Sequence, residues 1–196
     1  MKNELLFATH NRNKAAEIAR MTGDRYTLLT LDDAGITVDI PETADDLQGN
    51  ALIKARFLHQ LSGKACFADD TGLEVDALNG APGVTTARYA GPECDPQRNM
   101  DKLLKALDGQ TDRTARFRTV IAFIDVDGSE TLFEGVCEGT IATERHGERG
   151  FGYDPIFAPL GFGGQTFAQM SMDDKNKISH RGKAVCALAD FLNNRQ

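Results

Sequence analysis

The sequence predicts a single α/β domain with a mixed β-sheet, spanning residues 1–196, and three observations lead to it. The chain has 196 residues, 41% hydrophobic and 26% charged, which is enough for one substantial core. Apolar residues recur at three- and four-residue spacing in several segments, as on a helix face. Residues 117–141 instead carry the long β-branched and aromatic runs of a hairpin, which favours a mixed sheet over a purely parallel one.

The first part of the chain predicts one strand and two helices. Residues 5–8 are apolar and predict a buried strand, and residues 14–21 predict a helix that ends at Gly23. A second helix is expected over residues 45–61, with Gly63 ending it. Its predicted buried face comprises Leu47, Ala51, Ala55 and Leu58.

Turns and short strands follow the second helix. Residues 65–68 and 73–77 predict two strands with a turn between them at residues 69–72, because Asp and Gly are disfavoured inside strands. A further turn is expected at residues 79–83. The apolar face of a third helix is formed by Met100, Leu103, Leu104 and Leu107.

The last part of the chain predicts the hairpin and a return to helix. The hairpin over residues 117–141 turns near residues 127–129, which read Asp-Gly-Ser. Ser171 stands three residues before Asp174, in the form of a helix N-cap. The final helix is indicated by an apolar face of Ala184, Val185, Leu188 and Leu192.

Charge and cysteine usage exclude several classes of protein. Lys and Arg number 22 against 29 Asp and Glu, a net charge of −7, which argues against a nucleic-acid-binding protein and requires any phosphate site to be local. No apolar stretch approaches the length of a membrane helix. The four cysteines are dispersed and form no zinc or redox motif, so we expect reduced thiols, no membrane partner and a cytoplasmic location.

The carboxylates Asp69 and Asp70, at the end of an apolar run, are the strongest candidates for chemistry. A turn in which Asp caps main-chain amides is the simpler interpretation of such a pair. The functional alternative is a magnesium and water site, since Mg²⁺ takes oxygen ligands and a nearby carboxylate can orient or deprotonate water. Two adjacent carboxylates also raise each other's pKa, which suits a base.

Three further segments offer groups that suit a nucleotide. Residues 9–14 form a polar strand-to-helix loop that favours an anion. Residues 150–155 place aromatic rings and an Asp beside two glycines, where a ring could stack on a base. Residues 175–181 group cations and hydrogen-bond donors. For each segment alone a solvated loop or a packed bend is the more common explanation, but one nucleotide ligand accounts for all of them.

Residues 121–128 superficially match the motif of aspartate-nucleophile phosphatases, an apolar strand followed by Asp-x-Asp-x-Thr. In those enzymes the motif runs into a loop and a helix, whereas residues 130–136 continue as a strand. Ser129 also stands where the motif has Thr. The Asp-Gly pair is therefore interpreted as a hairpin turn.

Taken in order, these segments resemble the inosine triphosphate pyrophosphatase family over the whole chain. The matching residues are Thr9 to Lys14, Glu42-Thr43, Asn50-Ala51, Lys54-Ala55-Arg56, Ala68 to Leu73, Gly80 to Gly83, Ala87-Arg88-Tyr89, Phe151 to Phe157 and Ser179 to Gly182. Gly49 departs from the common pattern, which has Glu, and His10, Asn11 and Arg12 differ from the common Gly-Asn forms.

The resemblance implies a role for each matching position. Asp70 is similar to the family's proton acceptor and, with Glu42, to its magnesium ligands, and Asp69 to a supporting carboxylate. The positions similar to the family's substrate contacts are Thr9, His10, Asn11, Arg12, Asn13, Lys14, Thr71, Phe151, Gly152, Tyr153, Asp154, Lys175, His180 and Arg181.

The resemblance also implies a fold and an activity. The expected fold is elongated and two-lobed, with a long central mixed sheet flanked by helices and an active-site cleft between the lobes, in a homodimer. The expected activity is Mg²⁺-dependent hydrolysis of non-standard purine nucleoside triphosphates (dITP, ITP and XTP) to monophosphate and pyrophosphate. Two alternatives stay open: a related pyrophosphatase for modified pyrimidine nucleotides, and a nucleotide sensor without turnover.

Overall fold

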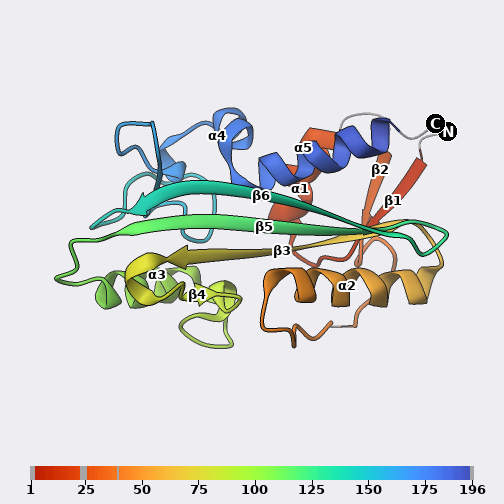
Figure 1. Cartoon of the computed structure of the whole chain (residues 1–196), viewed down its shortest axis with the longest axis horizontal. Coiled ribbons are helices and arrows are strands. Elements are labelled where there is room, and N and C mark those ends of the chain that lie inside the picture. Colours follow the sequence, from red (N-terminus) through yellow and green to blue (C-terminus); the bar gives the residue numbers. More distant parts are fainter. Residues whose placement is uncertain (1–2, 23–25, 39, 195–196) are drawn as a thin grey trace. The chain divides into compact units, whose positions relative to one another are not determined.

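The computed structural model describes residues 3–22, 26–38 and 40–194 (Figure 1). Contacts divide the chain into two compact units. Unit 1 comprises Met1–Asp70, Thr119–Gly135 and Arg181–Gln196, and unit 2 comprises Thr71–Arg118 and Val136–His180. The strand order of the sheet is β2-β1-β3-β5-β6-β7, with β4 paired to β3. Strands β3 (Cys66–Val75), β5 (Thr114–Ile124) and β6 (Glu130–Ile141) each contribute residues to both units.

Unit 1 is a layered arrangement of strands and helices. Strand β1 (Asn3–Phe7) runs parallel to both β2 (Tyr26–Thr30) and β3. Helices α1 (Arg12–Thr22) and α5 (His180–Asn193) cover one face of these strands, and α2 (Leu47–Ser62) covers the other (Figure 1). The core on the α1 and α5 side comprises Leu5, Phe7, Ile18, Phe67, Ile121, Phe123, Ala184, Val185, Leu188 and Leu192.

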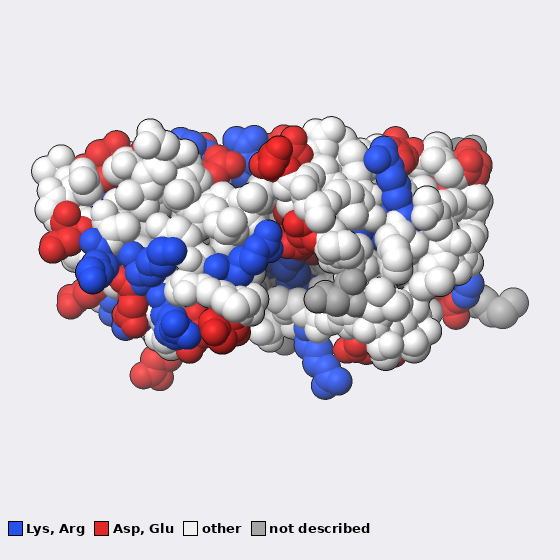
Figure 2. Space-filling model, turned by 90° about the horizontal axis from the view of Figure 1, so that it is seen from below, with Lys and Arg blue, Asp and Glu red and all other residues white. Residues whose placement is uncertain are grey.

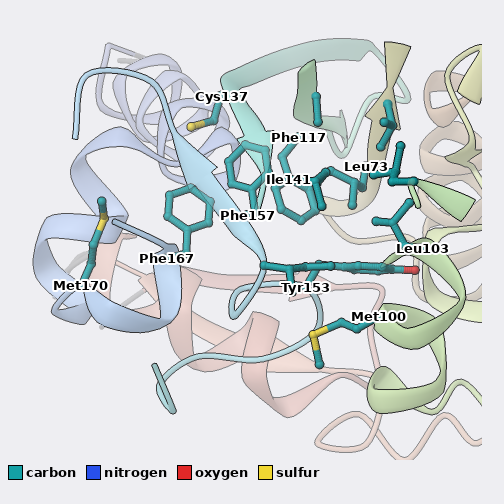
Figure 3. Packing of buried hydrophobic residues seen from close by; sticks show 14 residues of the cluster. Leu73, Met100, Leu103, Phe117, Cys137, Ile141, Tyr153, Phe157, Phe167 and Met170 are labelled. Atoms are coloured by element: carbon teal, nitrogen blue, oxygen red, sulfur yellow. The ribbon is translucent and has the colours of Figure 1, made fainter. Parts of the chain in front are cut away.

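Unit 2 has its own hydrophobic core. The short strands β4 (Pro82–Gly83) and β7 (Phe157–Pro159) run antiparallel to β3 and β6. The helices are α3 (Pro96–Ala106) and α4 (Met172–Ile178), with 3-10 turns at Asp76–Leu78, Thr86–Arg88 and Phe167–Gln169. Figure 3 shows the rings of Phe117, Phe157 and Phe167 gathered in this core, with Leu103 and Met100 of α3 nearby.

Most predicted helices and the hairpin are confirmed. Asp46 caps α2 by accepting from the main-chain N–H of Gly49, and Gly63 ends the helix at a φ of 62°, which is unfavourable for other residues. Ser171 caps α4 by accepting from Asp174 N. The hairpin turn over residues 125–129 is closed by main-chain bonds, so the phosphatase interpretation of this segment is excluded. The expected helix end at Gly23 lies outside the described residues.

The predicted turn at residues 69–72 is wrong, because β3 continues through it from Cys66 to Val75. Asp69 and Asp70 are both buried inside this strand, where isolated carboxylates would be costly. Cations supplied by three helices neutralise them, as described below.

Within the described residues, no helix is long and apolar enough to cross a membrane.

Candidate active site

Asp69 and Asp70 are consecutive strand residues, so their side chains point to opposite faces of the sheet. Asp69 meets cations from α1 and α5, whereas Asp70 meets a cation from α2. One dipeptide therefore carries two separate ion-pair systems, each on the face covered by the helices that supply its partners.

Asp69 is a structural anion between Lys14 and Arg181. Lys14 Nζ lies 3.0 Å from its carboxylate, and Arg181 Nε lies 3.7 Å from Asp69 Oδ2. Burial alone would raise the pKa of Asp69, but Lys14 and Arg181 lower it to about 2. Asp69 therefore stays ionised in the fold.

Asp70 has the environment of a proton acceptor. Its Oδ1 accepts a hydrogen bond from Lys54 Nζ at 3.0 Å, and its Oδ2 is buried without a hydrogen-bond partner among the described residues. Burial, with the charge of Glu42, raises the pKa of Asp70 above its ordinary value, against the opposing effect of Lys54. A buried oxygen without a partner is costly unless a ligand, water or ion completes it, so Asp70 Oδ2 can accept any of the three.

Glu42 lies in the same cluster through Lys54, whose Nζ is 2.7 Å from Glu42 Oε1. The sequence motif Lys54-Ala55-Arg56 does not by itself indicate this role for Lys54. A signal for it exists: Lys54 falls on the buried face of α2 with Ala51, Ala55 and Leu58, where a lysine requires an anionic partner.

The two carboxylates fit a magnesium ion. Mg²⁺ binds through one or two carboxylates and completes its coordination with water and substrate phosphates. Glu42 and Asp70 supply that number, and Asp70 Oδ2 accepts no hydrogen bond from the described residues. The described residues include no group of three or more His, Cys, Asp or Glu that could hold a metal. Glu42 and Asp70 match the number of carboxylates that Mg²⁺ takes from a protein when water and phosphate supply the rest.

The start of α2 positions Glu42, and Gly49 has a clear role there. A Cβ on Gly49 would lie 2.5 Å from the Ala44 Cβ, so only glycine lets this segment pack so closely on the helix. Asn50, which is fully buried, holds the same segment by accepting from Ala44 N through Oδ1 at 2.9 Å. Glycine in place of Glu at position 49 thus goes with close packing of Ala44, two residues after Glu42, against the helix.

The loop over residues 9–14 begins α1 in an ordered way. Thr9 Oγ1 accepts from Asn11 N at 3.0 Å, and Asn11 Oδ1 accepts from the main-chain N–H groups of Asn13 and Lys14. Arg12 and Asn13 are exposed, and the exposed His10 lies 2.7 Å from Asp32. Within the loop, Thr9 and Asn11 act on the main chain, and Lys14 joins the Asp69 cluster.

In unit 2, the expected base-binding segment is built around one buried ion pair. Asp154 Oδ2 accepts from Lys175 Nζ and from Phe151 N, each at 2.8 Å. The ammonium group also lies 4.9 Å from the centroid of the half-buried Phe151 ring. A side chain at Gly150 would collide with the Asp154 carboxylate, and Gly152 has a φ of 63°, so both glycines are needed for this turn.

The remaining residues predicted to contact substrate, Tyr153, His180 and Thr71, differ in how far they are buried. Tyr153 is 4% exposed in the core of unit 2, and its hydroxyl donates to Thr86 O at 2.8 Å, so its ring serves packing (Figure 3). His180 is equally buried and stacks on Phe117 with 4.5 Å between ring centroids, a supporting contact that sequence reasoning missed. Thr71 follows Asp70 in β3 and is half-buried.

Surface charge is mixed despite the net charge of −7. On the face shown in Figure 2, Lys and Arg side chains lie close to Asp and Glu side chains and form no extended basic field. Lys14, Lys54 and Lys175 are buried or half-buried, and each forms an ion pair with a carboxylate.

Comparison with known proteins identifies relatives along nearly the whole chain. A family model described as the Ham1 family matches residues 5–191. The dITP/XTP pyrophosphatases of Flavobacterium psychrophilum and Porphyromonas gingivalis are 50% and 53% identical, over 97% and 96% of this chain and 100% and 97% of theirs. The solved structure of the Staphylococcus aureus Ham1 protein is similar with a TM-score of 0.90 and 36% identity, covering 99% of this chain and 100% of that one.

Proposed function

The chain belongs to the Ham1 family, and from that premise we propose that it hydrolyses non-standard purine nucleoside triphosphates, dITP, ITP and XTP, to the monophosphate and pyrophosphate. The reaction would remove these nucleotides from the pool before they enter DNA or RNA. The relatives named dITP/XTP pyrophosphatases support the substrate class. We further propose that the reaction depends on Mg²⁺.

The observation that carries the proposal is the buried Asp70 carboxylate, with one oxygen paired to Lys54 and the other open. A carboxylate has about four lone-pair positions, so Asp70 can serve a cation and a water molecule together. Glu42 and Asp70 would hold Mg²⁺, which when bound supplies charge neutralisation of the triphosphate. The raised pKa of Asp70 suits a group that must take up a proton.

In the proposed step, Asp70 orients a water molecule toward the α-phosphorus and accepts its proton. The new bond joins the water oxygen to the α-phosphorus, and the bond from that phosphorus to the α–β bridging oxygen breaks. Pyrophosphate leaves with the bridging oxygen. Lys14 and Arg12 would offset the negative charge that develops on it, which is the main task of catalysis in such transfers.

The segment Phe151–Asp154 would recognise the base. The half-buried Phe151 ring offers a stacking surface, and Lys175, fixed by Asp154, places a cation 4.9 Å from the centroid of that ring. Donors to a 6-oxo group, for which His180, Arg181 and main-chain amides near Phe151 are candidates, would be left without a partner by the 6-amino group of adenine. Such mispairing discriminates strongly between substrates.

Product analysis tests the reaction directly. Purified protein is incubated with Mg²⁺ and ITP, XTP, dITP, dUTP or ATP, and pyrophosphate is separated from orthophosphate and monophosphate from diphosphate. We expect pyrophosphate with IMP, XMP or dIMP, and little product from ATP. Orthophosphate with diphosphate would contradict cleavage at the α-phosphorus. Preference for dUTP would favour the pyrimidine alternative, and nucleotide binding without any product would favour the sensor.

A further inference from the structure

Lys54 joins the two carboxylates that would hold the metal. Its Nζ lies 2.7 Å from Glu42 Oε1 and 3.0 Å from Asp70 Oδ1, so one ammonium group bridges residues of two different segments. The side chains of Lys54 and Asp70 are only 9% and 8% exposed. Water therefore screens the contact between Lys54 and Asp70 poorly, whereas Glu42, whose side chain is 28% exposed, is screened more.

Without a cation between them, the negatively charged carboxylates of Glu42 and Asp70 would repel each other. Lys54 supplies one positive charge in place of that cation and hydrogen-bonds one oxygen of each carboxylate. The same positive charge opposes the arrival of a divalent ion, which seeks the same two carboxylates. The group that stabilises the metal-free cluster is thus also a competitor of the metal.

We propose that Lys54 is an internal counter-ion of the Glu42–Asp70 pair, which keeps the carboxylates together without metal and weakens their affinity for a divalent cation alone. The inference rests on the proposed function in assigning these two carboxylates to the metal. A polyphosphate ligand offers Lys54 another anionic partner. When such a ligand binds, the charge of Lys54 therefore opposes metal binding less. Metal and nucleotide then bind cooperatively, and by linkage each raises the affinity for the other equally.

Manganese binding without nucleotide is the deciding measurement. Mn²⁺ is titrated into the full chain and free Mn²⁺ is followed by electron paramagnetic resonance, for the wild type and for Lys54→Met, which keeps the length of the side chain and removes its charge. We expect Lys54→Met to bind Mn²⁺ about tenfold more tightly. Its melting temperature without metal should fall, and Mn²⁺ should raise that temperature by more than it does in the wild type.

Two matched variants separate the counter-ion role from other effects. Lys54→Arg keeps the charge and should bind Mn²⁺ within about twofold of the wild type. Lys14→Met removes an equal charge from the same unit, but from the ion-pair partner of Asp69, which acts on Asp70 less than Lys54 does, so it should raise Mn²⁺ affinity much less than Lys54→Met. Lys54→Arg also keeps the test valid if Lys54→Met does not fold: arginine should then preserve weak Mn²⁺ binding, and tight binding by this variant would overturn the proposal.

Unchanged Mn²⁺ affinity in a folded Lys54→Met variant, or an equal gain in Lys14→Met, would overturn the counter-ion role. Cooperativity is tested by repeating the titration with the non-hydrolysable α,β-methylene analogue of ITP. The analogue should tighten Mn²⁺ binding about tenfold in the wild type and much less in Lys54→Met. If the chain hydrolyses no nucleotide, the proposed function fails, while the metal-only titration still decides the role of Lys54.

Discussion

Two neighbouring aspartates show how strongly position controls a residue of one type. Asp69 and Asp70 are both buried, yet the pKa of Asp69 is lowered to about 2 and that of Asp70 is raised. Burial acts on both in the same direction, so the difference comes from the charges on each face of β3. Lys14 and Arg181 act on Asp69, whereas Asp70 shares Lys54 with Glu42.

Replacing Asp70 by asparagine should separate chemistry from folding. Asp70→Asn keeps the size of the side chain and removes the proton acceptor, so we expect turnover of ITP to fall by about 10²–10⁴-fold with the far-ultraviolet circular dichroism spectrum unchanged. Asp69→Asn is compared with it for stability, because Asp69→Asn leaves the cations Lys14 and Arg181 beside an uncharged group. That variant should lose stability, by about 3 kcal/mol or more. Turnover of Asp70→Asn within a few fold of the wild type would refute the assignment.

The thiol of Cys66 gives a prediction about stability at alkaline pH. Burial raises the pKa of Cys66 from 9.0 to about 12, so between these values the folded state keeps a proton that the unfolded state loses. The free energy of unfolding should therefore fall as pH rises from 9 to 12, by at most about 1.4 kcal/mol per pH unit from this group. Urea unfolding at several pH values gives this free energy. Between pH 9 and 12 it should fall less steeply with pH in Cys66→Ala than in the wild type.

At the scale of elements, the start of α2 links helix packing to the candidate metal site. Gly49 allows Ala44 to lie against the helix, and Asn50 holds the same segment through Ala44 N. Both contacts lie within a few residues of Glu42, whose carboxylate is bound by Lys54 further along the same helix. One helix therefore places both the segment that carries Glu42 and the cation that fixes it.

Gly49→Ala should destabilise the protein even though alanine favours helices. The gain in helix propensity is about 1 kcal/mol, but the new methyl group would overlap the Ala44 Cβ. We expect a net loss of about 1–2 kcal/mol in urea unfolding and weaker Mn²⁺ binding, because the segment carrying Glu42 must shift. The exposed neighbour Gln48→Ala is the control, and it should change stability by less than about 0.5 kcal/mol. Equal effects from both variants would argue against the steric cause.

Periodicity explains which elements could be predicted. The helix around Leu47 and Leu58 and the hairpin turn at residues 125–129 show a clear repeat or turn signal, and both are present in the structure. The interior of β3 was missed because Asp69 and Asp70 oppose strand formation locally. Their burial depends on Lys14, Lys54 and Arg181, which are distant in sequence, so no local rule could anticipate it.

At the scale of the whole molecule, each unit has a separate core, but three strands carry residues of both. In β3, Phe67 belongs to the core of unit 1 and Leu73 to that of unit 2. In β5, Ile121 likewise belongs to the core of unit 1 and Phe117 to that of unit 2. Loss of order in either half of such a strand removes support from the other half, and this continuity favours unfolding as one cooperative domain.

Calorimetry of two core variants tests this cooperativity. Leu188→Ala opens a cavity in the core of unit 1 and Leu103→Ala in that of unit 2, each at a cost of about 2–5 kcal/mol. We expect both to lower the temperature of the same single transition, with calorimetric and van't Hoff enthalpies in agreement. Two transitions, each moved by only one of the variants, would show that the units unfold independently.

The sequence alone determined the mixed α/β class, the presence of the helices with the caps at Ser171 and Gly63, and the segments with candidate chemistry, because these depend on repeats, caps and residue types that are close in the chain. Only the tertiary structure revealed that Lys54 bridges Glu42 and Asp70, that Tyr153 packs in a core, and that Asp69 and Asp70 have opposite pKa shifts. Those features depend on which distant charges and apolar groups share a buried space. In that space burial and Coulomb interactions decide the outcome, and sequence spacing does not report them.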